Sequence, residues 1–114
     1  MDNFQLCPKF EKAMSIISQR WVGLIIYQLM QEGCQRFSQI ESTLPISGKV
    51  LSDRLKDLEQ KGIVKRVVIP ETPVRIEYSL TEKGRALEPV LKNIETWAEA
   101  WIDKDESESH KTCT

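Results

Sequence analysis

The sequence predicts a mainly α-helical fold with one small β-hairpin, which places it in the α+β class. Apolar residues recur at helical spacing from position 8 to position 62, β-branched residues fill two short runs after it, and helical spacing returns from position 81. A length of 114 residues fits one domain, and pairing with a second copy would help so small a unit. We expect the domain to span residues 1–102 and a charged, disordered tail to span residues 103–114.

The composition excludes several classes of protein. With 40% hydrophobic and 29% charged residues the chain is typical of globular proteins, and its net charge is only -1. No apolar run approaches the roughly 20 residues of a membrane span, and the N-terminus has no basic leader followed by an apolar run. We therefore expect no membrane association and a cytoplasmic location. Three cysteines, an odd number, indicate reduced thiols rather than a disulfide scaffold.

Two helices are predicted to open the chain. Proline suits the first helical position, so Pro8 and the apolar spacing after it predict a helix over residues 8–18. A second helix is predicted over residues 20–31, where the apolar residues exceed one face and indicate burial on two sides. Gly33 ends this helix.

A small helix over residues 38–44 and a longer helix over residues 47–62 are predicted next. Pro45 closes the small helix, because the residue before a proline is pushed out of helical conformation. Ser47 can cap the start of the longer helix, and Gly62 suits a left-handed residue at its end. This order is that of a helix-turn-helix, with the second helix placed to enter a DNA groove.

The longer helix has two different faces. Leu51, Leu55 and Leu58 form one stripe at positions i, i+4 and i+7, which predicts docking onto a core. A charged outer face is by itself ordinary for a solvated helix. However, residues 46–75 carry seven cationic side chains against four acidic ones, a local charge of +3 that favours nucleic acid. The outer face consists of Lys49, Ser52, Asp53, Lys56 and Gln60.

A hairpin follows Gly62, where the spacing changes from helical to alternating. β-branched residues predict a strand over 64–69, and residues 74–80 alternate again. Pro70 and Pro73 cannot extend a strand ladder, so they indicate a proline-bounded tip. Three helices followed by such a hairpin predict a winged helix-turn-helix.

A final helix, capped by Thr81, is predicted to carry Pro89 inside it with a kink at that proline. One unit of this size cannot bury the apolar faces of both this helix and the first one. We expect these additional N- and C-terminal helices to form the interface of a homodimer. The residues expected there are Phe4, Phe10, Met14, Ile94, Trp97 and Trp101.

Cys7 lies immediately before the first helix. Exposed backbone amides, the positive end of the helix dipole and the nearby Lys9 and Lys12 favour the thiolate, which is the reactive form. The alternative is a small buried hydrophobe, which is what a free cysteine usually is. We interpret Cys34, which lies in a turn, as structural.

Two strings carry a family resemblance. Residues 54–59 are Arg-Leu-Lys-Asp-Leu-Glu and residues 78–84 are Tyr-Ser-Leu-Thr-Glu-Lys-Gly, around a proline-rich hairpin. Together with Cys7-Pro8 and Arg20-Trp21, they resemble the HxlR-type winged-helix transcriptional regulators, a branch near the MarR-type regulators.

More narrowly, the chain is similar to the YodB and CatR subgroup of thiol-based repressors. In that subgroup a cysteine just before the first helix senses quinones, other electrophiles or oxidants, and Cys7 occupies that position. The resemblance implies Cys113 as a possible disulfide partner across the dimer.

These observations predict a dimeric repressor that binds operator DNA, is released by modification of Cys7, and needs no cofactor. Arg54 is the ambiguous member of the DNA-binding set, because it lies beside the leucine stripe and could instead hold Glu59 or a neighbouring helix. Base contacts are expected near the start of the longer helix, and phosphate or wing contacts from two outlying arginines. The full set is Arg36, Ser47, Lys49, Ser52, Arg54, Lys56 and Arg75.

Three alternatives stand beside this prediction. His110 and Cys113 have His-x-x-Cys spacing, a weak metal motif, and we predict no metal site. A pocket between Trp97, Trp101 and the first helix could admit a small aromatic ligand. The winged helix could also serve protein contacts alone. We predict no enzyme, because a Gly-rich phosphate loop and a Ser-His-Asp order are both missing.

Overall fold

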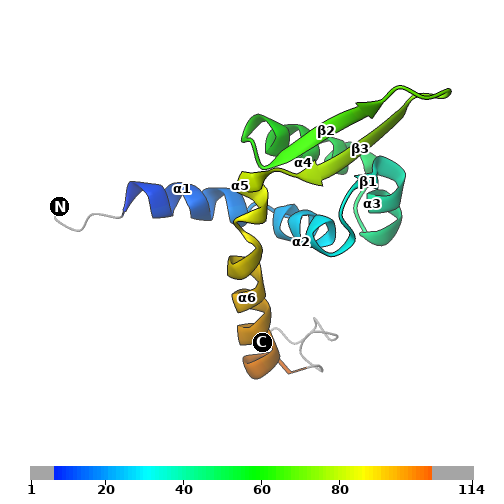
Figure 1. Cartoon of the computed structure of the whole chain (residues 1–114). Coiled ribbons are helices and arrows are strands. Elements are labelled where there is room, and N and C mark those ends of the chain that lie inside the picture. Colours follow the sequence, from blue (N-terminus) through cyan, green and yellow to red (C-terminus); the bar gives the residue numbers. More distant parts are fainter. Residues whose placement is uncertain (1–6, 104–114) are drawn as a thin grey trace.

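The computed structural model describes residues 7–103 (Figure 1). The tail predicted for residues 103–114 lies beyond Asp103 outside these residues. The elements confirm the α+β class and the predicted order of helices and strands. They are α1 (Pro8–Ile17), α2 (Val22–Glu32), β1 (Gln35–Arg36), α3 (Phe37–Thr43), α4 (Gly48–Gln60), β2 (Val64–Ile69), β3 (Arg75–Leu80), α5 (Glu82–Arg85) and α6 (Glu88–Trp101).

None of the helices in this part of the chain combines the length and apolarity that crossing a bilayer requires.

The three strands form one antiparallel sheet in the order β1-β3-β2. The hairpin of β2 and β3 runs in register from the pair Val64 and Leu80 to the pair Ile69 and Arg75. The short strand β1 adds to the other edge of β3, where Gln35 lies opposite Tyr78. In Figure 1 the hairpin extends beyond α3 and α4, which is the position of a wing.

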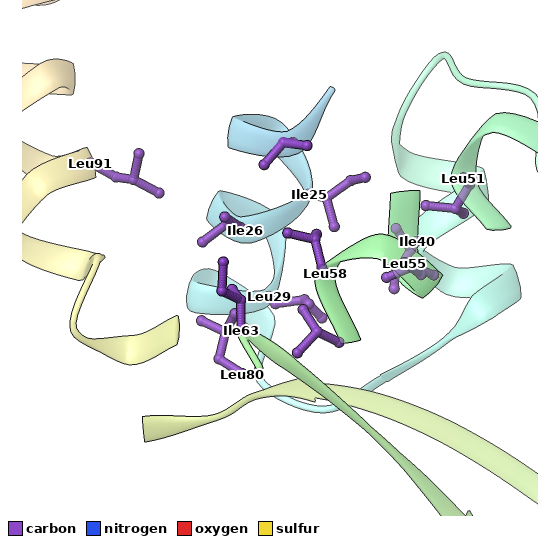
Figure 2. Packing of buried hydrophobic residues seen from close by; sticks show 12 residues of the cluster. Ile25, Ile26, Leu29, Ile40, Leu51, Leu55, Leu58, Ile63, Leu80 and Leu91 are labelled. Carbon is purple, nitrogen blue, oxygen red and sulfur yellow. The ribbon is translucent and has the colours of Figure 1, made fainter. Parts of the chain in front are cut away.

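The core is made by α2, the inner face of α4 and the base of the sheet (Figure 2). Helix α2 lies between α6 and α4 and contributes four fully buried residues, so the predicted burial on two sides is confirmed. The α4 leucine stripe is also fully buried. The buried apolar residues are Val22, Ile25, Ile26, Leu29, Ile40, Leu51, Leu55, Leu58, Ile63, Val64, Leu80 and Leu91.

Helix α4 begins and ends as predicted. Ser47 has extended backbone, and its Oγ accepts a hydrogen bond from the Val50 amide at 3.2 Å, which satisfies one of the unpaired donors of the first turn. Gly62 follows the helix with φ +76°, a conformation that a side chain would disfavour.

The prediction of one kinked C-terminal helix was wrong. The chain forms two helices, and Pro89 lies in the first turn of the second one, where its missing N–H leaves no hydrogen bond unmade. Before it, the Leu87 amide bonds to the Gly84 carbonyl at 3.0 Å, a tighter turn that ends α5. Helix α2 also begins later than predicted, at Val22, because Trp21 has a left-handed backbone.

Gly84 in α5 provides a test of this packing. An added Cβ would lie 2.3 Å from the Ile63 carbonyl oxygen, so we expect Gly84→Ala to lower the free energy of unfolding by about 1 to 3 kcal/mol. Gly23→Ala is the matched control: its Cβ meets nothing within 4 Å, and it should be neutral or stabilise by up to about 1 kcal/mol. Urea denaturation measures both, and equal stability of the two variants would contradict the packing.

Candidate nucleic-acid interface and thiol site

The charged side chains on the outer face of α4 are exposed to solvent. Lys49, with 84% of its side chain exposed, lies 3.6 Å from the Asp53 carboxylate, one turn further along the helix. Lys56 is exposed and has no ion pair among the described residues. Ser52 is half-buried and Gln60 is exposed. The face therefore presents two cations and one carboxylate, and Lys56 is its least compensated charge.

The start of α4 lies next to the Glu41 side chain of α3. Ser47 is occupied as the helix cap, and the Gly48 backbone lies so near α3 that an added Cβ would be 2.8 Å from the Glu41 carboxylate. Glu41 thus places a negative charge at the N-terminal end of α4, where the helix dipole favours anions.

The two outlying arginines lie together with two glutamates. Arg75 forms ion pairs with Glu71 at 3.3 Å and Glu77 at 3.1 Å. Arg36 on β1 lies opposite Glu77 in the backbone register of β1 and β3. The Arg36 amide donates to the Gln39 side chain at 2.8 Å and so helps to begin α3. This cluster, with two cations and two anions, has no net charge.

Arg54 does not join the outer face. Its Nε donates a hydrogen bond to the Arg20 carbonyl oxygen at 2.9 Å, and its side chain is half-buried. Of the two sequence interpretations, the contact favours the one in which Arg54 holds a neighbouring segment. That segment is the turn before α2 rather than Glu59.

The sequence analysis counted Lys65 and Arg66 in the local charge but gave them no role. Both are exposed on β2, the strand that follows α4, and neither has an ion pair among the described residues. Two consecutive cations on a strand point to opposite faces of the hairpin, so they put positive charge on both. The signal that could have found them is their position directly after the helix-turn-helix.

Cys7 is exposed at the N-terminal end of α1, where its carbonyl accepts the first helical hydrogen bond from the Glu11 amide at 2.9 Å. Cys7 is therefore not part of this chain's own core. Cys34 is exposed as well, between α2 and β1, and its interpretation as structural stays a prediction. Phe4, His110 and Cys113 lie outside the described residues. Within them, no group of three metal-binding side chains occurs.

Helices α1 and α6 expose large apolar side chains. No residue of α1 is buried, and Leu91 is the buried residue of α6. In Figure 1 the two helices extend from the core in different directions. The exposed residues on them are Phe10 (62%), Met14, Val90, Ile94, Trp97 (58%) and Trp101 (72%).

An open groove of about 610 Å³ lies where the α1–α2 turn, α2 and α6 meet. Its apolar walls include Trp21, Leu24 and Ile94. Tyr27 and Glu95 also line the groove, and the Tyr27 hydroxyl donates a hydrogen bond to the Glu95 carboxylate at 2.9 Å. Trp97 and Trp101, which the sequence analysis placed beside such a pocket, do not line it.

A helix-turn-helix whose second helix presents cations, followed by a two-stranded wing, defines the class of winged-helix DNA-binding regulators. The HxlR-like helix-turn-helix family matches residues 16–106, and the chain belongs to this family. It is therefore a transcriptional regulator and not an enzyme.

Relatives agree with this assignment. The chain is 62% identical over 104 residues to the HTH-type transcriptional regulator YvaP of Bacillus subtilis strain 168, covering 90% of this chain and 95% of YvaP. It is 50% identical over 99 residues to YodB of the same strain, covering 86% of this chain and 88% of YodB.

Solved structures match the whole fold. The reduced form of YodB from B. subtilis superposes with a TM-score of 0.78 at 50% identity, covering 87% of this chain and 97% of that one. YodB has also been solved after diamide treatment and with quinone bound, with TM-scores of 0.71 and 0.73. The oxidized form of the redox regulator HypR matches with a TM-score of 0.77 at 36% identity, covering 85% of this chain and 99% of HypR.

Proposed function

We propose that the protein is a dimeric repressor that binds operator DNA through α4 and the wing, and that quinones, other electrophiles or oxidants release it by modifying Cys7. The observation that carries the proposal is the exposed Cys7 thiol at the end of a helix with no buried residue. The likeness to YodB, which has reduced, diamide-treated and quinone-bound structures, supports it. As a regulator of genes it would act in the cytoplasm.

For DNA contact, the exposed face of α4 supplies Lys49, Ser52 and Lys56 to the major groove. Ser47 has its Oγ in use as a cap, so it contributes orientation and at most a shared contact. Arg36 is exposed and can meet phosphate directly. Arg75 would meet phosphate by exchanging Glu71 for it, which costs little because a pair this open to solvent contributes about 0 to 1 kcal/mol. We add Lys65 and Arg66 on β2 as contacts to the phosphate backbone of the DNA.

For sensing, thiolate chemistry at Cys7 requires access, and the side chain is exposed. A quinone would form a carbon–sulfur bond with the thiolate and become a hydroquinone ring. An oxidant would join Cys7 to a second thiol, with Cys113 as the candidate that the family resemblance suggests. Either product adds bulk or a tether at the tip of α1.

For assembly, the apolar faces of α1 and α6 would pack against those of a second copy. Phe10, Met14, Ile94, Trp97 and Trp101 are exposed on these helices, and exposed aromatics are typical anchors of interfaces. A symmetric dimer would place two α4 helices at two half-sites of an operator, so a movement of α1 could change their spacing.

The second candidate is a regulator that binds a small aromatic ligand without covalent modification. The groove beside Trp21, Leu24 and Ile94 favours it, because it is apolar and of a size that ligand sites have. A ligand of this kind would release DNA from a variant without Cys7, and no added mass would remain on the protein after denaturation.

The DNA-binding prediction concerns the α4 face. Lys56→Ala should weaken binding to a fragment of DNA upstream of the protein's own gene by about 1 to 3 kcal/mol and lower the slope of log affinity against log salt by about 0.9. Lys49→Ala should also weaken DNA binding, but by less, because the Asp53 carboxylate already offsets the charge of Lys49. Lys92→Ala on α6 is the control, and a loss there equal to that of Lys56→Ala in gel-shift titrations would contradict the assignment.

The dimer prediction uses charge insertion. Trp97→Glu should weaken dimerisation by about 2 kcal/mol or more, since it removes an anchor and buries a carboxylate. Val68→Glu, a change at an apolar wing residue that is 50% exposed, should leave assembly unaltered. Sedimentation at several concentrations measures both. A wild-type monomer at micromolar concentration would refute the dimer.

The sensor prediction uses the two described cysteines. Quinone or diamide should release wild-type protein from DNA, while Cys7→Ser should remain bound, because it lacks the nucleophile. Cys34→Ser is the matched control and should still be released by quinone. Intact mass spectrometry without reductant, beside the gel shift, identifies the product. Release of Cys7→Ser with wild-type dose dependence would exclude Cys7 as the sensor.

A further inference from the structure

Arg54 lies on the inner side of α4 despite its charge. At about 100° per residue, it is about 60° around the helix from Leu51 and about 140° from Lys49. Its half-buried side chain reaches the turn between α1 and α2, where Nε donates to the Arg20 carbonyl oxygen at 2.9 Å. This bond joins segments 34 residues apart in the sequence.

The turn that Arg54 contacts is strained. Trp21 has φ +77°, and it is the one residue other than glycine with positive φ among residues 7–103. A bulky side chain disfavours this conformation, which persists only where the surroundings hold it. Two hydrogen bonds hold it from either side: the Arg54 bond to the carbonyl before Trp21, and the Val22 amide to the Gln19 carbonyl at 3.1 Å.

The side chains of the same turn are also engaged. The Arg20 guanidinium lies over the Trp21 ring, 5.0 Å from its centroid, so Arg20 is fixed through both its backbone and its side chain. Val22, the next residue, is fully buried. One end of the turn is therefore anchored in the core, and its backbone conformation is tied to α4.

The other end of the turn is α1, which is weakly attached. None of its residues is buried, and Ile16 and Ile17 at its C-terminal end are half-buried. Because α1 is attached to its own chain at this end, a displacement at Cys7 would be transmitted along the helix to residues 18–21.

We propose that Arg54 is a positioning residue rather than a DNA contact, and that its bond to the Arg20 carbonyl couples the direction of α1 to the orientation of α4. The coupling rests on the proposed function, because it gives the displacement at Cys7 a route to the DNA-binding helix. The positioning role does not rest on it, since the bond exists whatever moves α1. The guanidinium group can remain partly hydrated while its Nε donates the hydrogen bond to the turn.

The test compares Arg54→Met and Arg54→Lys with the wild type in the full-length protein. Arg54→Met should weaken binding of the reduced protein to its upstream DNA by about two- to tenfold, as expected for one lost hydrogen bond. It should leave the salt slope unchanged, because no phosphate contact is removed. Arg54→Lys, which keeps a donor, should restore part of the affinity.

Hydrogen exchange gives a readout that a DNA contact would not move. Without DNA, Arg54→Met should speed amide exchange in peptides that cover residues 18–25, which include the Val22 and Ile25 amides, and leave the β2–β3 hairpin unchanged. Lys56→Met is the matched control and should change the salt slope but not this exchange. The urea midpoint of each variant checks that the fold remains.

Redox response tests the coupling. The ratio of DNA affinities before and after quinone treatment should fall toward one in Arg54→Met. A wild-type ratio in that variant would overturn the coupling, and a lowered salt slope with unchanged exchange would overturn the positioning role. If the wild type itself does not respond to quinone, the proposed sensing fails, while the exchange and salt measurements still decide the role of Arg54.

Discussion

Burial of the α4 leucine stripe determines how the rest of the molecule can work. Leu51, Leu55 and Leu58 are fully buried, and each contributes about 1.5 to 3 kcal/mol relative to an exposed side chain. The Ser47 cap contributes about 1 kcal/mol, and the exposed pair of Lys49 and Asp53 contributes about 0.3 to 0.5 kcal/mol. The apolar face therefore fixes the rotation of α4, and the outer residues are directed outward as a consequence. Their chemistry can change with little effect on the fold.

Helices α1 and α6, unlike α4, bury little of their apolar surface within the chain. They are amphipathic, but the chain that folds around α2 and α4 offers them almost no apolar partner, and α6 is attached to it at Leu91 and Glu95. Leu91 is its buried residue, and Tyr27 joins Glu95 at 2.9 Å while accepting from Gln31 at 2.8 Å. Trp97 and Trp101 lie beyond this attachment. A second copy that covered them would set the separation of two α4 helices without altering either core.

The sequence predicted the features that local rules determine. The cap at Ser47, the stripe at Leu51 and the end at Gly62 follow from spacing and residue type, so the limits of α4 were correct. The ion pairs of Arg75 were also open to prediction, because Glu71 is four residues away and Glu77 is its i+2 neighbour on the same face of β3. Pro89 was misjudged because a proline is compatible with either a kink or a helix start, and only the tight turn at Leu87 decides between them.

Other features depend on contacts between distant segments, which spacing does not encode. The partner of Arg54 is a backbone carbonyl in another turn, and no periodic pattern points to a carbonyl. The sequence does not predict the left-handed backbone of Trp21 either, because glycine is the residue that normally marks such a position.

The distribution of charge fits a protein that must both hold and release DNA. Carboxylates accompany two of the cations predicted to contact DNA: Asp53 lies beside Lys49, and Glu71 and Glu77 lie beside Arg75. The exposed pair of Lys49 and Asp53 contributes little, so phosphate can replace the carboxylate there, but the nearby negative charge limits nonspecific attraction. The bond from Arg54 is different in kind, because it joins α4 to a backbone carbonyl beside a strained residue rather than to a carboxylate. The proposed DNA contacts can therefore exchange partners, while the proposed positioning contact of α4 stays within the chain, at the turn that continues from α1.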